Sequence, residues 1–543
     1  MAVNVSISIV LFSLAFLSYW SAGTDSQARF LFRHNHAWPL IAAGVIVLFE
    51  PFFRTVGRQF TNRIPRPARS AQSVITWLPV GLFFAGAMIL FLLPAQRLEP
   101  APQGLGDSLW LVEIVPLASD IIGYFSSFDE ILEPLIRSLF YKSGSLLFGE
   151  SLLAAGRIDL ILFWLGLYST LIGLCQLGVI VWFLKAQSIR NQLVGFLILF
   201  CVPATQLFAN YIEHYSFAAF ALTSVLLLIW WDFENKAVFI WPLYSIAVLS
   251  ALAVLHHLIA VFFLPGLIAY IWQRHRIVRC SLRMIIGPTS LALLILAIGN
   301  FIYFQMLQLS TGGSHVVHPP VLPLHKFFSS ANLAKILFVL LFTTPLFLAI
   351  AASKGFFRQF DSFERIVIVF AVTFFIQMAV WNPVIGLPAD WDLLSFVSWP
   401  LHVLIFRKYT KNDTRFTHRS GLNSIHRPGL IAVGSLTLLP MMMWMLYNHK
   451  AQQDDTTAIA ISRQSLWYIK QNETCALIPT DAKKQLLYLQ LLSDRANLSQ
   501  KQYAMVQMKL GQDCQKITEG DTATAEPFET TRTFLQSVTM PSH

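Results

Sequence analysis

Residues 106–143 read GDSLWLVEIVPLASDIIGYFSSFDEILEPLIRSLFYKS, and this stretch is the acidic exception in a basic, apolar chain. It belongs to a longer segment, 97–157, that separates two long apolar runs. The acids of that segment are Glu99, Asp107, Glu113, Asp120, Asp129, Glu130, Glu133 and Glu150, against the bases Arg97, Arg137, Lys142 and Arg157. Because so polar a segment cannot lie inside a bilayer, it lies at a membrane surface, where it can hold a reaction centre.

The composition supports the membrane class. The chain has 543 residues, of which 55% are hydrophobic and 13% are charged, and its mean hydropathy is +0.58. These values exclude a set of soluble domains. The formal net charge of +10 could suggest nucleic-acid binding, but the basic residues form short clusters between apolar runs. That pattern sets membrane topology, so no nucleic-acid partner is expected.

Thirteen apolar runs are long enough to cross a bilayer, since a transmembrane helix needs roughly 17–25 residues. They are 3–21, 37–53, 73–95, 158–184, 191–208, 215–232, 237–255, 257–273, 284–307, 333–352, 365–381, 393–406 and 428–446. We therefore predict an all-α polytopic bundle of about thirteen spans. The short run 393–406 and the nearly continuous junction of the runs at 255–257 could change that count.

We divide the chain into three parts. Additional spans and a basic loop occupy 1–72, the transmembrane catalytic core with its outer loop 96–157 occupies 73–446, and a small soluble helical domain occupies 447–543. Arg-rich loops alternate with acidic ones, which predicts that the basic loops are cytoplasmic and that Asp107 and the tail lie on the other side. Cys475 and Cys514 would then share an oxidising compartment, and a disulfide between them is expected.

The acidic segment contains several candidate site residues. Apolar residues recur at helical spacing from 131 to 140, which indicates an amphipathic helix lying on the membrane. Acids at the first helical turn have an ordinary explanation, because they complement the helix dipole. Asp107 has no such explanation and is a candidate for catalysis. The other candidates in this segment are expected to bind substrate, and they are Asp129, Glu130, Arg137 and Lys142.

Further polar clusters fall on the same predicted face. NYIEHY at 210–215 offers Tyr211, Glu213 and His214, and a carboxylate at a lipid boundary is costly unless it is paired or used. Histidines that can shuttle protons or donate to phosphate oxygens are His256, His257, His315 and His318, although boundary residues with local partners are an open alternative. Asp390 and Asp392 in PADWDLL could bind a divalent ion or a sugar hydroxyl, or form an ordinary polar loop.

Four stretches together resemble a known superfamily: FDEILEPL at 128–135, FANYIEHYSFAAFALTSVLLLIWW at 208–231, LAVLHHLIAVFFLPGLIAYIW at 252–272, and PADWDLLSFVSWPL at 388–401. Their layout is similar to the multi-spanning GT-C glycosyltransferases, including relatives of protein O-mannosyltransferases and lipid A aminoarabinose transferases. The resemblance covers roughly 73–446. Two additional spans precede the loop, and the paired-acid motif of the family is here GDS, without a second acid beside Asp107.

The resemblance implies a donor sugar linked to a polyprenyl phosphate and a carboxylate in the first large loop that acts as base or metal ligand. By position that carboxylate is Asp107, with Glu213 as a second catalytic candidate. A divalent ion held by Asp107, Asp390 and Asp392 would be a cofactor. The chain would be a multi-pass protein of a bacterial inner membrane, active on the non-cytoplasmic face, with an acceptor that the sequence leaves open.

Two other functions compete with sugar transfer from a lipid. An O-antigen polymerase or ligase also has many spans and a large outer loop, but it would favour Arg and His over carboxylates there. A membrane transporter would place polar groups near the midplane of its spans. The apolar runs of this chain look mostly clean, with polar groups collected at one rim, which favours the glycosyltransferase.

Overall fold

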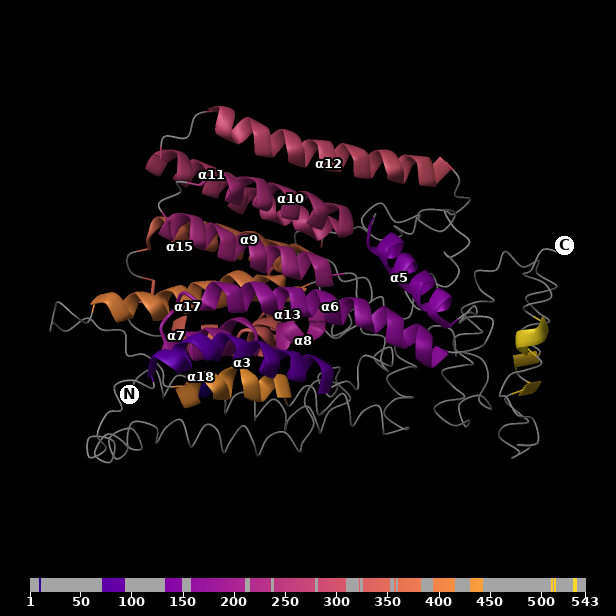
Figure 1. The fold of residues 1–543 in the computed structure, drawn as a ribbon, viewed down its shortest axis with the longest axis horizontal. Coiled ribbons are helices and arrows are strands. Elements are labelled where there is room, and N and C mark those ends of the chain that lie inside the picture. The colour runs from indigo at the N-terminus through magenta and orange to yellow at the C-terminus, as the bar shows by residue number, and fades with distance from the viewer. Residues whose placement is uncertain are drawn as a thin grey trace.

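The structure is a computed structural model that describes part of the chain. The described residues are 9–10, 71–92, 132–148, 158–209, 215–235, 239–278, 282–308, 322, 326–351, 356–357, 360–381, 394–415, 430–442, 509–510, 512–513 and 531–534. Every element within these ranges is a helix. Most of the long helices run side by side in one bundle (Figure 1). The predicted all-α polytopic fold is confirmed.

The helix bounds follow the apolar runs closely. The helices are α3 (Ala71–Leu92), α5 (Glu133–Phe148), α6 (Ile158–Leu184), α7 (Ile189–Leu199), α8 (Pro203–Ala209), α9 (Ser216–Glu234), α10 (Trp241–His256), η5 (Leu258–Phe263), α11 (Leu264–Val278), α12 (Leu282–Gln308), α13 (Ser330–Thr343), α14 (Pro345–Ala351), α15 (Ser362–Val380), η7 (Ser395–Val397), α17 (Ser398–Arg415) and α18 (Leu430–Leu436). Within the described ranges, 5 helices are long and apolar enough to cross a membrane, or up to 6 if one bent pair is a single span. The first two predicted spans lie almost wholly outside those ranges, so thirteen stays a prediction.

Two predicted spans are broken helices. The run 191–208 forms α7 and α8, which are separated at 200–202, just before Pro203. The run 333–352 forms α13 and α14, which meet at Thr344 before Pro345 with a bend of 97°. Proline has no backbone N–H to donate to the preceding turn, so a helix ends or kinks there. Each of these two predicted runs is therefore interrupted by a break in the helix.

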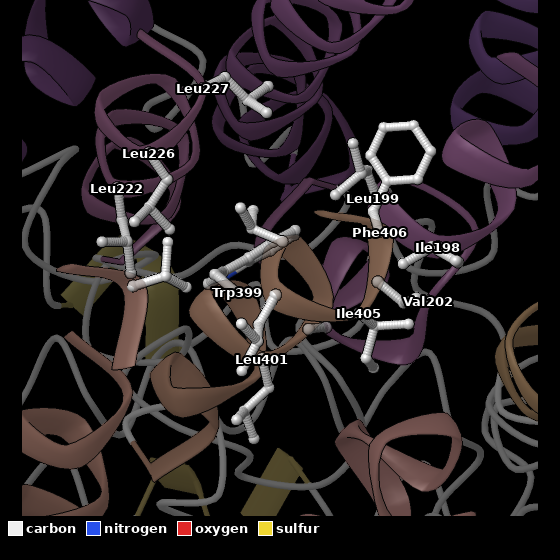
Figure 2. Close-up of a cluster of buried hydrophobic side chains, with 14 of the residues drawn as sticks. Ile198, Leu199, Val202, Leu222, Leu226, Leu227, Trp399, Leu401, Ile405 and Phe406 are labelled. Atoms are coloured by element: carbon white, nitrogen blue, oxygen red, sulfur yellow. The ribbon is translucent and has the colours of Figure 1, made fainter. Parts of the chain in front are cut away.

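Helix α9 is the centre of the bundle, and α12 lies at its edge (Figure 1). The apolar window of α9 is 78% buried, whereas that of α12 is only 11% buried. Figure 2 shows leucines of α9 gathered with side chains from the end of α7 and from α17 around Trp399. Small residues such as Ala218 and Ala221 let neighbouring helices approach α9 closely.

Ion pairs join the helices at the bundle end opposite α5. Arg407 of α17 bonds to Glu234 of α9 at 2.8 Å and to Asp361, before α15, at 3.1 Å. Lys411 bonds to Asp361 at 2.7 Å. Burial alone would raise the pKa of the Asp361 carboxyl, but the Glu364 N–H, Lys411 and Arg407 together hold that pKa below its usual value. The pairs therefore fix α9, α15 and α17 relative to one another.

Arg274 of α11 makes the most deeply buried pair at this end. Its Nε lies 2.8 Å from Asp232 Oδ2, with side chains only 3% and 0% exposed, and the Tyr270 hydroxyl donates to the same oxygen at 2.7 Å. We expect Arg274→Met to lower the free energy of unfolding by about 3–5 kcal/mol, because it leaves a buried carboxylate without its cation. Thermal unfolding in detergent measures this. Arg276→Met is the control, since Arg276 is exposed two residues away, and equal melting temperatures for the two variants would contradict the prediction.

Gly173 of α6 lies against α8. A Cβ atom at position 173 would come within 2.4 Å of the Ala209 Cβ atom, whereas a Cβ at Gly178 on the same helix would meet nothing within 4 Å. We expect Gly173→Ala to destabilise the protein by about 1–3 kcal/mol through overpacking. Gly178→Ala should be neutral or slightly stabilising, because alanine favours a helix. Indistinguishable unfolding curves for the two variants would refute this close approach.

Candidate functional site

The site begins where α5 meets the end of α10. The backbone N–H of Leu132 donates to the carbonyl oxygen of Leu255 at 2.8 Å, one residue before α5 begins and one before α10 ends. Figure 1 shows α5 inclined across this end of the bundle, close to the ends of α6 and α10. We call this the α5 end. The described part of the acidic stretch, which begins at Leu132, thus docks directly beside the LHHL motif.

A buried ion pair anchors α5. Arg137 Nε lies 2.8 Å from Glu133 Oε1, one helical turn apart, and both side chains are 0% exposed. The Tyr168 hydroxyl donates to Glu133 Oε2 at 3.1 Å, and its ring lies 4.6 Å from the Arg137 guanidinium carbon. Arg137 Nη2 donates to Ser169 Oγ at 3.1 Å. Since buried charges are stable only when paired and hydrogen-bonded, these contacts explain why α5 presents its charged face to the bundle.

Helix α5 has one exposed apolar face and one buried charged face. Its leucines at 139, 146 and 147 are exposed, so the apolar face is available to lipid while the Glu133–Arg137 face is covered by protein. First-turn acid preference is therefore not the whole explanation for Glu133. Lys142 is exposed and lies apart from the buried pair.

The start of α9 joins the same cluster. Ser216 Oγ donates to Ser169 Oγ at 3.2 Å, and the buried Tyr215 ring packs edge-on against His257 at 4.5 Å. Tyr215 is the last residue of the NYIEHY stretch, and Ser216 follows it directly. The structure therefore brings together α5, α6, α9 and the α10–η5 junction at the α5 end.

The two histidines of LHHL have different environments. His257 Nδ1 accepts a hydrogen bond from the Ile259 N–H at 3.0 Å and so caps η5, which is a local structural role. His256 is 3% exposed, and its Nδ1 lies 2.8 Å from the Leu252 carbonyl oxygen. His256 Nε2 has no hydrogen-bond partner among the described residues.

The remaining predicted site residues lie outside the part of the chain that the structure describes. They are Asp107, Asp129, Glu130, Tyr211, Glu213, His214, His315, His318, Asp390 and Asp392. The disulfide predicted between Cys475 and Cys514 also falls there. Among the described residues, no group of three or more His, Cys, Asp and Glu side chains could hold a metal ion. The catalytic and metal assignments therefore stay predictions.

Sequence reasoning overlooked Tyr168, Ser169 and Ser216. The signal was present, because Tyr-Ser-Thr at 168–170 interrupts the otherwise apolar run 158–184. The expectation of clean spans was also too simple. Gln176 Nε2 donates to Thr223 Oγ1 at 3.1 Å between α6 and α9, and Gln377 is buried in α15.

An apolar cavity of about 370 Å³ lies between α10, α11 and α12. Its lining runs along α10 from Leu243 to Val254, which lies two residues before the LHHL histidines, and along η5 and α11 from Ala260 to Ile271. Lining residues Leu264 and Leu293 are 55% and 61% exposed, so the cavity is open at its side.

Comparisons with known proteins add a likeness in fold. No protein-family model and no curated protein sequence matches the chain. A crystal structure of ArnT from Cupriavidus metallidurans bound to undecaprenyl phosphate matches with TM-score 0.38 and 11% identity, covering 87% of this chain and 78% of that one. The apo state of that protein matches with TM-score 0.39 and 10% identity, covering 84% and 74%.

A third match is the archaeal oligosaccharyltransferase AglB from Archaeoglobus fulgidus in complex with an inhibitory peptide and a dolichol-phosphate. Its TM-score is 0.35 and its identity 13%, with 77% of this chain and 60% of that chain covered.

Proposed function

We propose that the chain is a membrane glycosyltransferase that moves a sugar from a polyprenyl-phosphate-linked donor to an acceptor on the non-cytoplasmic face. One observation carries this proposal: an open apolar cavity runs along α10 and reaches Val254, next to the residue at which the polar α5 end docks. Val254 lines the cavity, and Leu255 accepts the backbone hydrogen bond that docks α5. Such a pairing suits an amphiphile whose chain is apolar and whose head group is polar.

The apolar cavity and the polar cluster would bind different parts of the donor. Apolar ligand surface is stabilised by about 25 cal/mol for each Å² that it buries, so the cavity favours the isoprenoid chain. The α5 end, with its buried polar cluster, would lie beside the phosphate and the sugar. The Glu133–Arg137 pair is buried and has no net charge, so its proposed role is to hold α5 in place and not to bind the phosphate. The exposed Lys142 on the same helix is a candidate cation for the phosphate.

The chemistry itself is assigned to Asp107, with Glu213 as the second candidate. A carboxylate base takes the proton of the acceptor hydroxyl as its oxygen attacks the anomeric carbon, and the polyprenyl phosphate leaves with the bonding electrons. A divalent ion held by Asp107, Asp390 and Asp392 would supply stabilisation of the leaving phosphate. The acceptor is a lipid, a glycan or a protein.

The test is reconstitution. The purified chain is placed in phospholipid vesicles with undecaprenyl phosphate carrying mannose, glucose or 4-amino-4-deoxyarabinose, and transfer of label to an envelope extract is followed. We expect transfer from at least one donor and none from the corresponding free sugar. If no lipid-linked sugar is consumed or bound by the folded protein, the proposal is wrong.

A further inference from the structure

His256 is held in one orientation by two contacts. Its ring stacks on Phe217 with centroids 3.9 Å apart and planes 14° from parallel. Its Nδ1 lies 2.8 Å from the carbonyl oxygen of Leu252, four residues earlier in α10. With the side chain 3% exposed, the ring has little freedom to turn, so the direction of Nε2 is set before any ligand arrives.

The hydrogen-bond pattern decides which nitrogen carries a proton. A carbonyl oxygen can only accept, so Nδ1 of His256 is the N–H that donates to Leu252. A proton on Nε2 as well would create a cation whose second N–H has no acceptor among the described residues, and burial makes such a group costly. Nε2 therefore presents a bare lone pair. A buried acceptor left without a hydrogen bond destabilises the protein, and a ligand that donates to it would remove that penalty.

His256 Nε2 is buried beside the junction of α5 and α10. Glu133 and Arg137 are near enough for their charges to act on the His256 ring. The residue before His256 accepts the docking bond from Leu132, and the residue two positions before it lines the apolar cavity. The His256 ring itself faces α9, where it stacks on Phe217, so the head group would have to reach it past the end of α10.

We propose that His256 Nε2 accepts a hydrogen bond from a hydroxyl group of the donor sugar. This inference rests on the proposed function. The phosphate of the donor is a poor partner, because its ionised oxygens are acceptors and would face another acceptor. Sugar hydroxyls are donors, and each can satisfy one lone pair. His256 is thus a specificity-determining residue for a hydroxyl-bearing head group.

Lipids with and without a sugar separate the contribution of the sugar to binding from that of the phosphate. Binding of undecaprenyl phosphate and of undecaprenyl-phosphate mannose, glucose and aminoarabinose to the detergent-solubilised full chain is measured by thermal shift and by titration. The wild type should bind at least one sugar-bearing lipid more tightly than undecaprenyl phosphate. His256→Phe keeps a ring for Phe217 and should reduce that preference about 2- to 10-fold, the effect of one neutral hydrogen bond. Its affinity for undecaprenyl phosphate should not change.

Two further variants complete the test. His256→Gln can place an amide oxygen near the position of Nε2 and should restore most of the preference. His402→Phe removes another buried histidine, on α17, and should leave the preference intact. Equal weakening of both lipids by His256→Phe, or no rescue by the His256→Gln variant, would overturn the proposal. Failure of the wild type to bind any of the lipids would instead refute the proposed function, and the inference with it.

Discussion

Exchange of Asp107 for Asn is expected to lower the rate of sugar transfer about 100-fold to 10,000-fold, the usual cost of losing a general base. Asparagine keeps the size and the hydrogen-bonding capacity of the side chain but cannot accept the proton of the acceptor hydroxyl. Folding should change little, because Asp107 is not predicted to stabilise the first turn of a helix, as other acids of the segment are, and so its charge has no such structural role to lose.

The measurement needs a matched control. Asp120→Asn removes another carboxylate of the same segment, to which no role is assigned, and should leave transfer near the wild-type rate. Both variants are purified, their melting temperatures are compared, and transfer from the preferred undecaprenyl-phosphate sugar is followed. Near-full transfer by the Asp107→Asn variant would remove Asp107 from the mechanism and make Glu213 the next candidate.

The helical layout was largely predictable, because a bilayer requires long apolar helices and leaves little choice. The run 158–184 coincides with α6, and the run 284–307 differs from α12 by two residues or fewer at each end. The junction of the runs at 255–257 lies within a residue of the turn between α10 and η5, where His257 caps η5. The break before α14 was not predicted, because hydropathy alone does not register Pro345 within an apolar sequence.

The polar cluster was only partly predictable. The i, i+4 spacing of Glu133 and Arg137 is visible in the sequence, but their burial depends on Tyr168 and Ser169, more than 30 residues farther along the chain. Likewise, the sequence singled out both histidines of LHHL without distinguishing them. Only the contacts of each ring show that His257 caps a helix and that His256 keeps a nitrogen without a partner in the described part of the chain.

The Glu133–Arg137 pair offers the largest stability effect at the site. We expect Arg137→Met and Glu133→Gln, each alone, to lower the free energy of unfolding by about 3–5 kcal/mol, since each leaves one buried charge without its partner. Lys142→Met on the same helix should change it by less than about 0.5 kcal/mol, as is usual for an exposed residue. Thermal unfolding in detergent measures all three.

The double variant distinguishes a structural role of the ion pair from a role of Arg137 in substrate binding. Replacement of a buried ion pair by neutral groups of similar volume is often close to neutral, so Glu133→Gln with Arg137→Met should regain most of the lost stability. The amide oxygen that Glu133→Gln introduces can still accept from the Tyr168 hydroxyl, and Ser169 keeps its bond with Ser216. If the pair only docks α5, transfer activity recovers together with stability, and this is the result we expect. A stable double variant that no longer binds undecaprenyl phosphate would show instead that Arg137 contacts the phosphate, the role its sequence position first suggested.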